Sequence, residues 1–389
     1  MPSSRCVISI ERRKEFVQAV IAGTMSFAAL CHQFQFSRQT GYRFWRRYQS
    51  QGESGLSLRS RAAHHPGRAW PALWRERLRQ ARLTHPRWGP KKLRTLLPRR
   101  HRPSLATLGR WLRQMHLSQR RRYRRLGPRL PWPHLTTPSQ TNEVWTVDFK
   151  GSFCTRDGQR LHPLTVRDLF SRYVLCVRVY FHQREAPLRK LFKRLFRQYG
   201  HPCIIRCDHG VPWASIGPLA LARLSVWWWR LGIRVEFTAK GCPQQNAAHE
   251  QHHRVLKADT LRSPAPNPHA QQRRFERWRH YYNRQRPHEA LNQQPPARYY
   301  RPNPSGARSL LAPHYPDALA TRRVHPNGEI VWEGRRRFVG DAFAGELLGL
   351  FVLSQGVWSI HFLHLEIGHL YRTDTGGMRP ANHVSFKKV

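Results

Sequence analysis

Positive charge dominates this chain and limits the partners that it can have. Its 389 residues carry 68 Lys and Arg against 22 Asp and Glu, a formal net charge of +46. So many positive charges repel one another in a compact chain, and their excess is larger than solubility requires. Each phosphate that a cation neutralises releases condensed counterions, which drives the binding of nucleic acid. We therefore expect a polyanionic partner, with DNA as the leading candidate.

Other classes of partner and compartment find little support. The longest stretches without charged side chains, 16–37 and 347–365, are interrupted by Gln, Ser, Gly and His, which a membrane-spanning helix avoids. No secretory apolar core follows Lys14. We expect a cytoplasmic protein without a membrane partner. The seven scattered cysteines favour buried reduced thiols, and Cys203 and Cys207 make only a weak case for zinc.

Residues 1–62 are predicted to form a first helix-turn-helix DNA-binding domain. Gly23 should end one helix, and Ser26 and Ser37 should cap the next two. The outer face of the third helix carries side chains that reach base edges and phosphates in a major groove. The alternative is an ordinary helical hairpin with a solvated basic face. The candidate DNA-binding residues are Arg38, Gln39, Thr40, Arg43 and Arg47.

Residues 63–118 are predicted to form a second helix-turn-helix domain, within a segment (1–140) that holds 30 basic and four acidic side chains. Helices are expected at 73–83, at 91–97 and after Ser104. Residues 119–140 form a basic, proline-rich segment that we interpret as a linker. The linker could also follow a phosphate backbone or enter a minor groove. The candidate DNA-binding residues are Arg110 and Arg113 in the last helix, and Arg121 and Arg122 in the linker.

The composition changes near Thr141, and residues 141–300 predict an α/β core with a mixed sheet. Trp227, Trp228 and Trp229 should pack the covering helix, with at least one at an interface. Residues 310–389 carry short strands at close intervals and predict a small β-barrel. The expected core strands are 142–153, 161–168, 172–180, 203–207 and 233–237, with helices at 185–199, 215–231 and 245–257. The expected C-terminal strands are 329–332, 335–339, 347–353, 357–363 and 366–371.

Acidic side chains are scarce in the predicted core, so their positions are informative. Asp148 interrupts an apolar strand, where a carboxylate needs compensation. Asp208 directly follows an apolar strand, at the end where open α/β sheets place their sites. Glu250 lies on a predicted helix, on a face that we expect to carry Asn246, His253, Arg254 and Lys257 as well.

If these three carboxylates converge, each negative charge raises the pKa of the other two unless a cation is present. Ligands that are all oxygen atoms suit Mg²⁺ or Mn²⁺. Two such ions about 3.5–4 Å apart would serve an in-line displacement at phosphorus. The alternative is three unrelated acids that cap helices or pair with arginines.

Five motifs follow one another in the predicted core: VWTVDFKG at 144–151, HPLTVRD at 162–168, IRCDHG at 205–210, GCPQQNAAHEQHHR at 241–254 and YYNRQRPH at 281–288. In this order they resemble the retroviral-integrase type of catalytic core and, within it, the insertion-sequence 481 family of bacterial transposases. SRQTGY at 37–42 and HPRWGP at 85–90 also resemble the two leading helix-turn-helix units of that family. The resemblance covers nearly the whole chain.

The resemblance implies a ribonuclease-H-like core whose catalytic, metal-binding D-D-E residues are Asp148, Asp208 and Glu250. It implies a transposase that binds terminal inverted repeats, cleaves their 3′ ends and transfers the strands into target DNA. Mg²⁺ or Mn²⁺ would be the cofactor, with no nucleotide cofactor. Synapsis of two ends implies at least a homodimer on DNA. We expect further DNA contacts near the metals from Asn246, His249, His253, Arg254 and Lys257.

The chain departs from the family's motifs at four positions, none of which removes a metal ligand. His209 replaces the usual Asn, Ala247 the common Gly, and Gln251 and His252 an Arg and an apolar residue. Whether this copy is active is therefore open. One alternative is a catalytically silent DNA-binding regulator derived from a transposase. Another is a nuclease of the same fold that hydrolyses DNA without joining it.

Overall fold

A computed structural model of the chain divides into two compact units, Met1–Arg75 and Glu76–Val389, which are described separately. Among the helices of the described residues, none combines the length and the apolar character that crossing a membrane requires. Arg121, Arg122 and Asn246, all predicted to bind DNA, lie outside the described residues. The described residues are 8–57, 70–118, 135–239, 242, 245, 247–304, 306 and 308–381.

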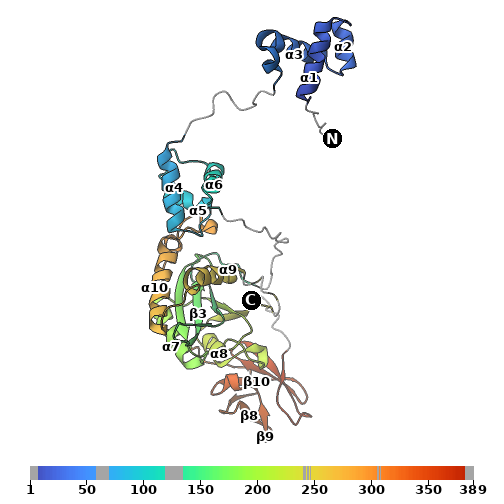
Figure 1. Cartoon of the computed structure of the whole chain (residues 1–389). Coiled ribbons are helices and arrows are strands. Elements are labelled where there is room, and N and C mark those ends of the chain that lie inside the picture. The colour runs from blue at the N-terminus through green and yellow to red at the C-terminus, as the bar shows by residue number, and fades with distance from the viewer. Residues whose placement is uncertain are drawn as a thin grey trace. The chain divides into compact units, whose positions relative to one another are not determined.

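Residues 8–57 of the first unit form three α-helices (Figure 1), and the ends of these helices follow the predicted caps. Gly23 ends the first helix in the left-handed conformation, with φ of 64°. The Ser26 and Ser37 hydroxyls accept hydrogen bonds from the backbone N–H groups of Ala29 and Thr40 at 3.3 and 3.2 Å. The predicted helix-turn-helix pattern is confirmed. The helices are α1 (Ile10–Ala22), α2 (Phe27–Gln33) and α3 (Arg38–Gln51), followed by a 3₁₀ turn (Gly52–Leu56).

Close helix packing holds this unit together. Phe16 is fully buried between the helices, and Phe44 of α3 is 3% exposed. A Cβ atom at Gly41 would lie 2.6 Å from the Cys31 sulfur, so only glycine allows α3 to approach α2 this closely. Arg13 donates to the Leu56 carbonyl at 2.9 Å and thereby ties the 3₁₀ turn to α1.

The second helical region also agrees with its sequence prediction. The Ser104 hydroxyl accepts a hydrogen bond from the Thr107 N–H at 3.2 Å. Leu78, Leu93 and Leu108 are fully buried, which gives the three helices a common apolar contact. The helices are α4 (Ala72–Thr84), α5 (Pro90–Leu93) with a 3₁₀ turn (Arg94–Leu96), and α6 (Leu105–Gln114).

Part of this region belongs to the same compact unit as the α/β core. The Tyr281 hydroxyl lies 2.8 Å from Nδ1 of His85. The His85 ring stacks on Trp88, and Arg87 forms an ion pair with Asp259. Polar and aromatic contacts thus connect residues that the sequence separates by nearly two hundred positions.

The core is a six-stranded mixed sheet between two layers of helices (Figure 1). Strands β5 and β6 run parallel to β1, whereas β3 is antiparallel to β1, and β2 and β4 are antiparallel to β3. The mixed α/β prediction is confirmed. The strands are β1 (Val144–Phe149), β2 (Phe153–Cys154), β3 (Arg160–Asp168), β4 (Val174–Tyr180), β5 (Ile204–Cys207) and β6 (Arg234–Phe237).

Helices cover both faces of this sheet. Trp145 and Val147 join the main apolar cluster together with Phe192 of α7 and Trp228 of α8. On the other side, α9 and α10 cover the sheet, and Phe275 of α10 packs with valines of β4. The helices are α7 (Glu185–Tyr199), α8 (Arg223–Arg230), α9 (Ala247–Leu256) with a π-helical turn (Lys257–Leu261), and α10 (Pro268–Arg284).

Two helices differ from the sequence predictions. We expected one helix over 215–231, but α8 begins only at Arg223. Pro218 begins a short 3₁₀ turn, and Leu219 and Ala220 have φ of 53° and 56°, which no continuous α-helix accepts. No prediction was made for α10, although its apolar spacing is typical of a helix that is buried along one side.

The C-terminal region is an antiparallel sheet with a separate hairpin. A closed barrel was expected, but the five main strands follow the open order β13-β12-β11-β10-β7 in the described part of the chain. The predicted hairpin turn at Glu333 and Gly334 is confirmed, with φ of 47° and 71°. The strands are β7 (Ala320–Arg323), β8 (Glu329–Trp332), β9 (Arg335–Phe338), β10 (Leu347–Ser354), β11 (Val357–Phe362), β12 (Leu365–Tyr371) and β13 (Arg379–Pro380).

This sheet packs against α8 of the core. The Trp229 ring meets the His364 ring edge-on, with 5.3 Å between centroids. Arg230 forms an ion pair with Glu346 at 2.6 Å. The prediction that one of the three consecutive tryptophans lies at an interface is confirmed.

Candidate active site

Two of the three predicted carboxylates lie at the same end of neighbouring parallel strands. β1 and β5 pair in register, with Val144 opposite Ile204 and Thr146 opposite Arg206. Asp148 and Asp208 follow the last pair by two residues each. Because strand side chains alternate between faces, Asp148 lies on the same face of β1 as Thr146. Asp208 is the first residue after β5 and follows Arg206 by the same step of two residues.

Helix α9 carries the third carboxylate and covers the polar face of the sheet. Its buried side consists of His249, His252 and His253, which are 0%, 2% and 4% exposed. Glu250 lies on the exposed side of the same helix. We expected His253 to share the face of Glu250. This is wrong, because the side of α9 that carries His249 and His253 meets the threonines of the sheet and is buried, whereas Glu250 is exposed.

Threonine hydroxyls fix the two buried histidines nearest to Asp148. Thr165 Oγ1 lies 2.6 Å from Nε2 of His249 and 2.7 Å from Nε2 of His253. Thr146 Oγ1 lies 2.9 Å from Nδ1 of His249. Neither threonine was predicted from the sequence. Two signals point to them: Thr146 lies on the same face of β1 as Asp148, and Thr165 lies opposite Asp148 in β3.

Asp148 is electrostatically coupled to the other two carboxylates. Its pKa is raised to about 7, first by burial and next by the negative charge of Asp208. Lys150 opposes this shift, and Glu250 adds a smaller contribution that raises the pKa. Burial and both Asp208 and Asp148 also raise the pKa of the Cys207 thiol. These charges therefore act on one another across the strand ends.

Burial keeps the neighbouring histidines neutral at pH 7. It lowers the pKa of His253 to about 3, with Lys150 contributing to the same direction. It also lowers the pKa of His249 well below its ordinary value. The contact between His253 Nδ1 and Asp148 Oδ2, at 3.5 Å, is therefore a weak polar contact and not a charged salt bridge.

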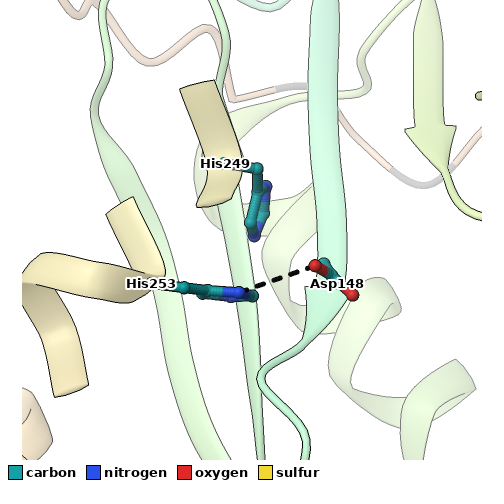
Figure 2. A group of neighbouring side chains, drawn as sticks. All are labelled: Asp148, His249 and His253. Carbon is teal, nitrogen blue, oxygen red and sulfur yellow. Dashed lines mark ion pairs between the residues drawn. The ribbon is translucent and has the colours of Figure 1, made fainter. Parts of the chain in front are cut away.

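The tightest group of potential metal ligands differs from the predicted triad. Among the described residues, Asp148, His249 and His253 each offer one ligand atom, and these atoms all lie within 4.8 Å of one another (Figure 2). Asp208 and Glu250 lie outside this group, and both are exposed. Among the described residues, the potential ligand set therefore joins Asp148 to two histidines and not to the other two carboxylates.

The remaining predicted DNA-binding residues divide by exposure. His249 and His253 were expected to contact DNA, but their burial under α9 and their threonine partners keep both rings from the surface. Thr40 and Arg47 are half-buried on α3. The exposed candidates are Arg38, Gln39 and Arg43 on α3, Arg110 and Arg113 on α6, and Arg254 and Lys257 on and after α9.

The cysteines fit the expectation of reduced thiols only in part. The thiols of Cys31, Cys176 and Cys207 are free and buried, as expected. Cys154 and Cys203 are free but exposed. Cys203 and Cys207 do not belong to the group of metal-ligating side chains found among the described residues.

Four segments of the chain match known protein families. Residues 12–64 match a helix-turn-helix domain. Residues 138–243 and 231–296 match the integrase core domain. Residues 319–376, which contain β7–β12, match the C-terminal domain of the IS481 family transposases.

Proteins of insertion elements are among the similar sequences. An uncharacterized 31.7 kDa protein of insertion element IS407 from Burkholderia multivorans is 28% identical over 215 residues, 55% of this chain and 75% of that protein. An uncharacterized 39.2 kDa protein of insertion element IS476 from Xanthomonas euvesicatoria is 28% identical over 229 residues, 57% of this chain and 63% of that protein.

Solved structures of retroviral integrases also resemble the chain. The HTLV-2 integrase catalytic core domain in complex with magnesium matches 42% of this chain and 100% of its own, with 13% identity and a TM-score of 0.31. A simian T-cell lymphotropic virus intasome matches 74% of this chain and 97% of its own, with 16% identity and a TM-score of 0.37. With a helix-turn-helix domain, an integrase core and the family's own C-terminal domain in sequence, the chain belongs to the IS481 family of transposases.

Proposed function

We propose that this transposase binds the terminal inverted repeats of its own element, cleaves their 3′ ends and transfers the strands into target DNA. Asp148, Asp208 and Glu250 are the proposed catalytic carboxylates. The observation that carries the proposal is the parallel pairing of β1 with β5, in which Thr146 lies opposite Arg206 and which Asp148 and Asp208 each follow by two residues. The origin of its relatives in insertion elements supports the same reaction.

The three carboxylates fit a hard divalent cation such as Mg²⁺ or Mn²⁺. The raised pKa of Asp148 reflects burial and repulsion by Asp208 and Glu250. A cation between them removes that repulsion, and carboxylate oxygens are the ligands that these ions prefer. When bound, such ions activate the attacking oxygen and stabilise the leaving oxygen at phosphorus.

The side chains around the carboxylates would position DNA for this reaction. Arg254 and Lys257 are exposed and follow Glu250 by four and seven residues. This spacing keeps them on its side of the helix, where they would neutralise phosphates next to the reacting one. A water molecule would first attack the phosphorus at the transposon end and release a 3′-hydroxyl. That hydroxyl would then attack a target phosphodiester, so that one bond forms for each bond broken.

The helix-turn-helix regions would supply recognition of the transposon ends. Arg38, Gln39 and Arg43 are exposed near the start of α3, and Arg110 and Arg113 are exposed on α6. Side chains of these types bind phosphates and guanine or adenine edges. Synapsis of two ends requires at least two copies of the chain on DNA, which we propose as the working assembly.

A strand-transfer assay with oligonucleotides of the element's ends, a target plasmid and Mg²⁺ or Mn²⁺ tests this function. The wild type should join the ends to target, whereas Asp148→Asn, Asp208→Asn and Glu250→Gln should each abolish joining and retain end binding. Glu185→Gln, which alters an acid in the first turn of α7, is the matched control and should remain active. Binding without joining under either metal would instead indicate a silent regulator, and cutting without joining a nuclease.

A further inference from the structure

Two histidines and one aspartate under α9 form a ligand set that the proposed reaction does not use. His249 and His253 are four residues apart on the buried side of the helix, and Asp148 lies beside them near the end of β1 (Figure 2). One ligand atom from each side chain lies within 4.8 Å of the other two. We infer that Asp148, His249 and His253 bind a borderline divalent transition-metal ion, for which Zn²⁺ is the probe.

The distances suit such an ion. Nδ1 of His253 and Oδ2 of Asp148 are 3.5 Å apart. Two ligands of a tetrahedral Zn²⁺, each bonded at 2.0–2.1 Å, are about 3.3 Å apart. An ion between these two atoms therefore needs only a small adjustment of side chains that already face each other.

The threonines hold both rings as metal-binding histidines are usually held. His253 keeps Nε2 on the Thr165 hydroxyl and presents Nδ1 toward Asp148. The Nδ1 atom of His249 would remain hydrogen-bonded to the Thr146 hydroxyl. Its Nε2 atom, which now contacts the Thr165 hydroxyl, would bind the ion instead. A hydrogen bond at the second ring nitrogen orients a ligating imidazole and fixes its tautomer.

The ligand chemistry separates this site from the proposed Mg²⁺ site. Two imidazoles and one carboxylate favour Zn²⁺ and neighbouring transition metals, whereas Mg²⁺ prefers oxygen ligands and keeps several waters. The segment 249–253 also has the H-E-x-x-H spacing that places two imidazoles on one helix face. One fifth of the Asp148 side chain is exposed, which gives an ion access from solvent.

Occupancy of this site would inhibit strand transfer, because Asp148 belongs to both ligand sets. A Zn²⁺ ion held by Asp148, His249 and His253 withdraws that carboxylate from Asp208 and Glu250. This consequence rests on the proposed function, whereas the binding of the ion does not.

Titration of the untagged, metal-free, full-length protein with Zn²⁺ by calorimetry, and with Co²⁺ by visible absorption, tests the site. We expect one strong site per chain. His249→Gln and His253→Gln should each weaken it by at least about tenfold, since even the loss of a group that only orients a ligand costs about 10–100-fold. His252→Gln, a buried neighbour on the same helix outside the set, and Asp208→Asn should both retain binding. Zn²⁺ should also raise the melting temperature of the wild type but not of the histidine variants.

Other outcomes overturn the inference in identifiable ways. Absence of strong binding, or equal binding by His249→Gln and His253→Gln, shows that these residues do not hold the ion. If neither histidine variant folds, Asp148→Asn carries the same test, and full binding by that variant excludes the site. If Zn²⁺ binds as expected but leaves Mg²⁺-dependent joining unchanged, the inhibitory role is wrong. If the wild type never joins DNA, the proposed function fails while the binding result stands.

Discussion

The first helical unit and the polar face beneath α9 are stabilised by different kinds of interaction. In the first unit, local signals decide the structure: Gly23, Ser26 and Ser37 each act on the helix end next to them. Beneath α9, His249 meets Thr146 and Thr165, which lie about a hundred and about eighty residues earlier in the chain. Local chemistry therefore specifies where the helices of the first unit begin and end, whereas tertiary packing specifies the site beneath α9.

The same contrast applies to how each region handles polar groups. The exposed serine caps of the first unit satisfy backbone donors that water could also reach. Under α9, the buried rings of His249 and His253 contact the hydroxyls of Thr146 and Thr165, and the His253 ring also contacts the Asp148 carboxylate. An unpaired group costs more there, so each partner in the site restricts its neighbours more strongly.

The largest expected effect is the loss of the first unit's core in Phe16→Ala. Phe16 is fully buried and meets the rings of Phe27, Phe34 and Phe36. Its truncation should cost about 3–5 kcal/mol, which a small helical unit can hardly sustain. Hydrogen exchange should then show lost protection over 10–56 and intact protection in the α/β core, and binding of transposon ends should fall. Phe181→Ala, at a side chain 52% exposed, is the control.

Persistent protection of α1–α3 in Phe16→Ala would contradict this view of the first unit. It would mean that the helix caps alone maintain the fold, and that the aromatic cluster contributes less than its burial indicates. Such a result would sharpen the comparison, because it would make the unit even more local in origin.

The next effect concerns the pH dependence of the metal-free protein, where the site should respond and the first unit should not. Asp148 has a folded pKa of about 7, above its ordinary 3.8. The folded state therefore binds the proton more tightly than the unfolded state, so the stability from this group is lost as pH rises from about 4 to about 7. In Asp148→Asn this loss is absent. The variant should thus be more stable than the wild type at pH 8 in EDTA, by at most about 4 kcal/mol, and similar at pH 4.

Thermal unfolding of the wild type and Asp148→Asn at pH 4 and pH 8 checks this difference, with Asp157→Asn as the control acid. If the melting temperature changes equally with pH in the wild type and in Asp148→Asn, burial and the neighbouring negative charges do not raise the pKa of the Asp148 carboxylate. The proposed convergence of Asp148 with Asp208 would then lose its electrostatic support.

The sequence was sufficient for elements whose cause is local and insufficient where distant segments meet. Helix α7 begins and ends at its predicted residues, because the apolar spacing that indicates it lies within the segment and Gly200 directly follows it. The sequence correctly predicted Asp148 within a strand and Asp208 directly after one. The burial of His249 and His253 was not predictable, since it depends on which side of α9 meets the sheet. The antiparallel C-terminal strands were predicted, but their closure into a barrel is not shown, and short alternating strands do not reveal whether the edges of their sheet pair.

The smallest expected effect is local and belongs to the first unit. Ser37 caps α3 by accepting a hydrogen bond from the Thr40 N–H at 3.2 Å, and Ser37→Ala should therefore cost about 1 kcal/mol. Ser50→Ala, inside the same helix and exposed, should cost nothing or slightly stabilise, because alanine is the better helix former. Hydrogen exchange of α3 in the two variants measures the difference. An equal response would show that tertiary packing determines where α3 begins. Helix α3 would then depend on distant contacts, as the site beneath α9 does.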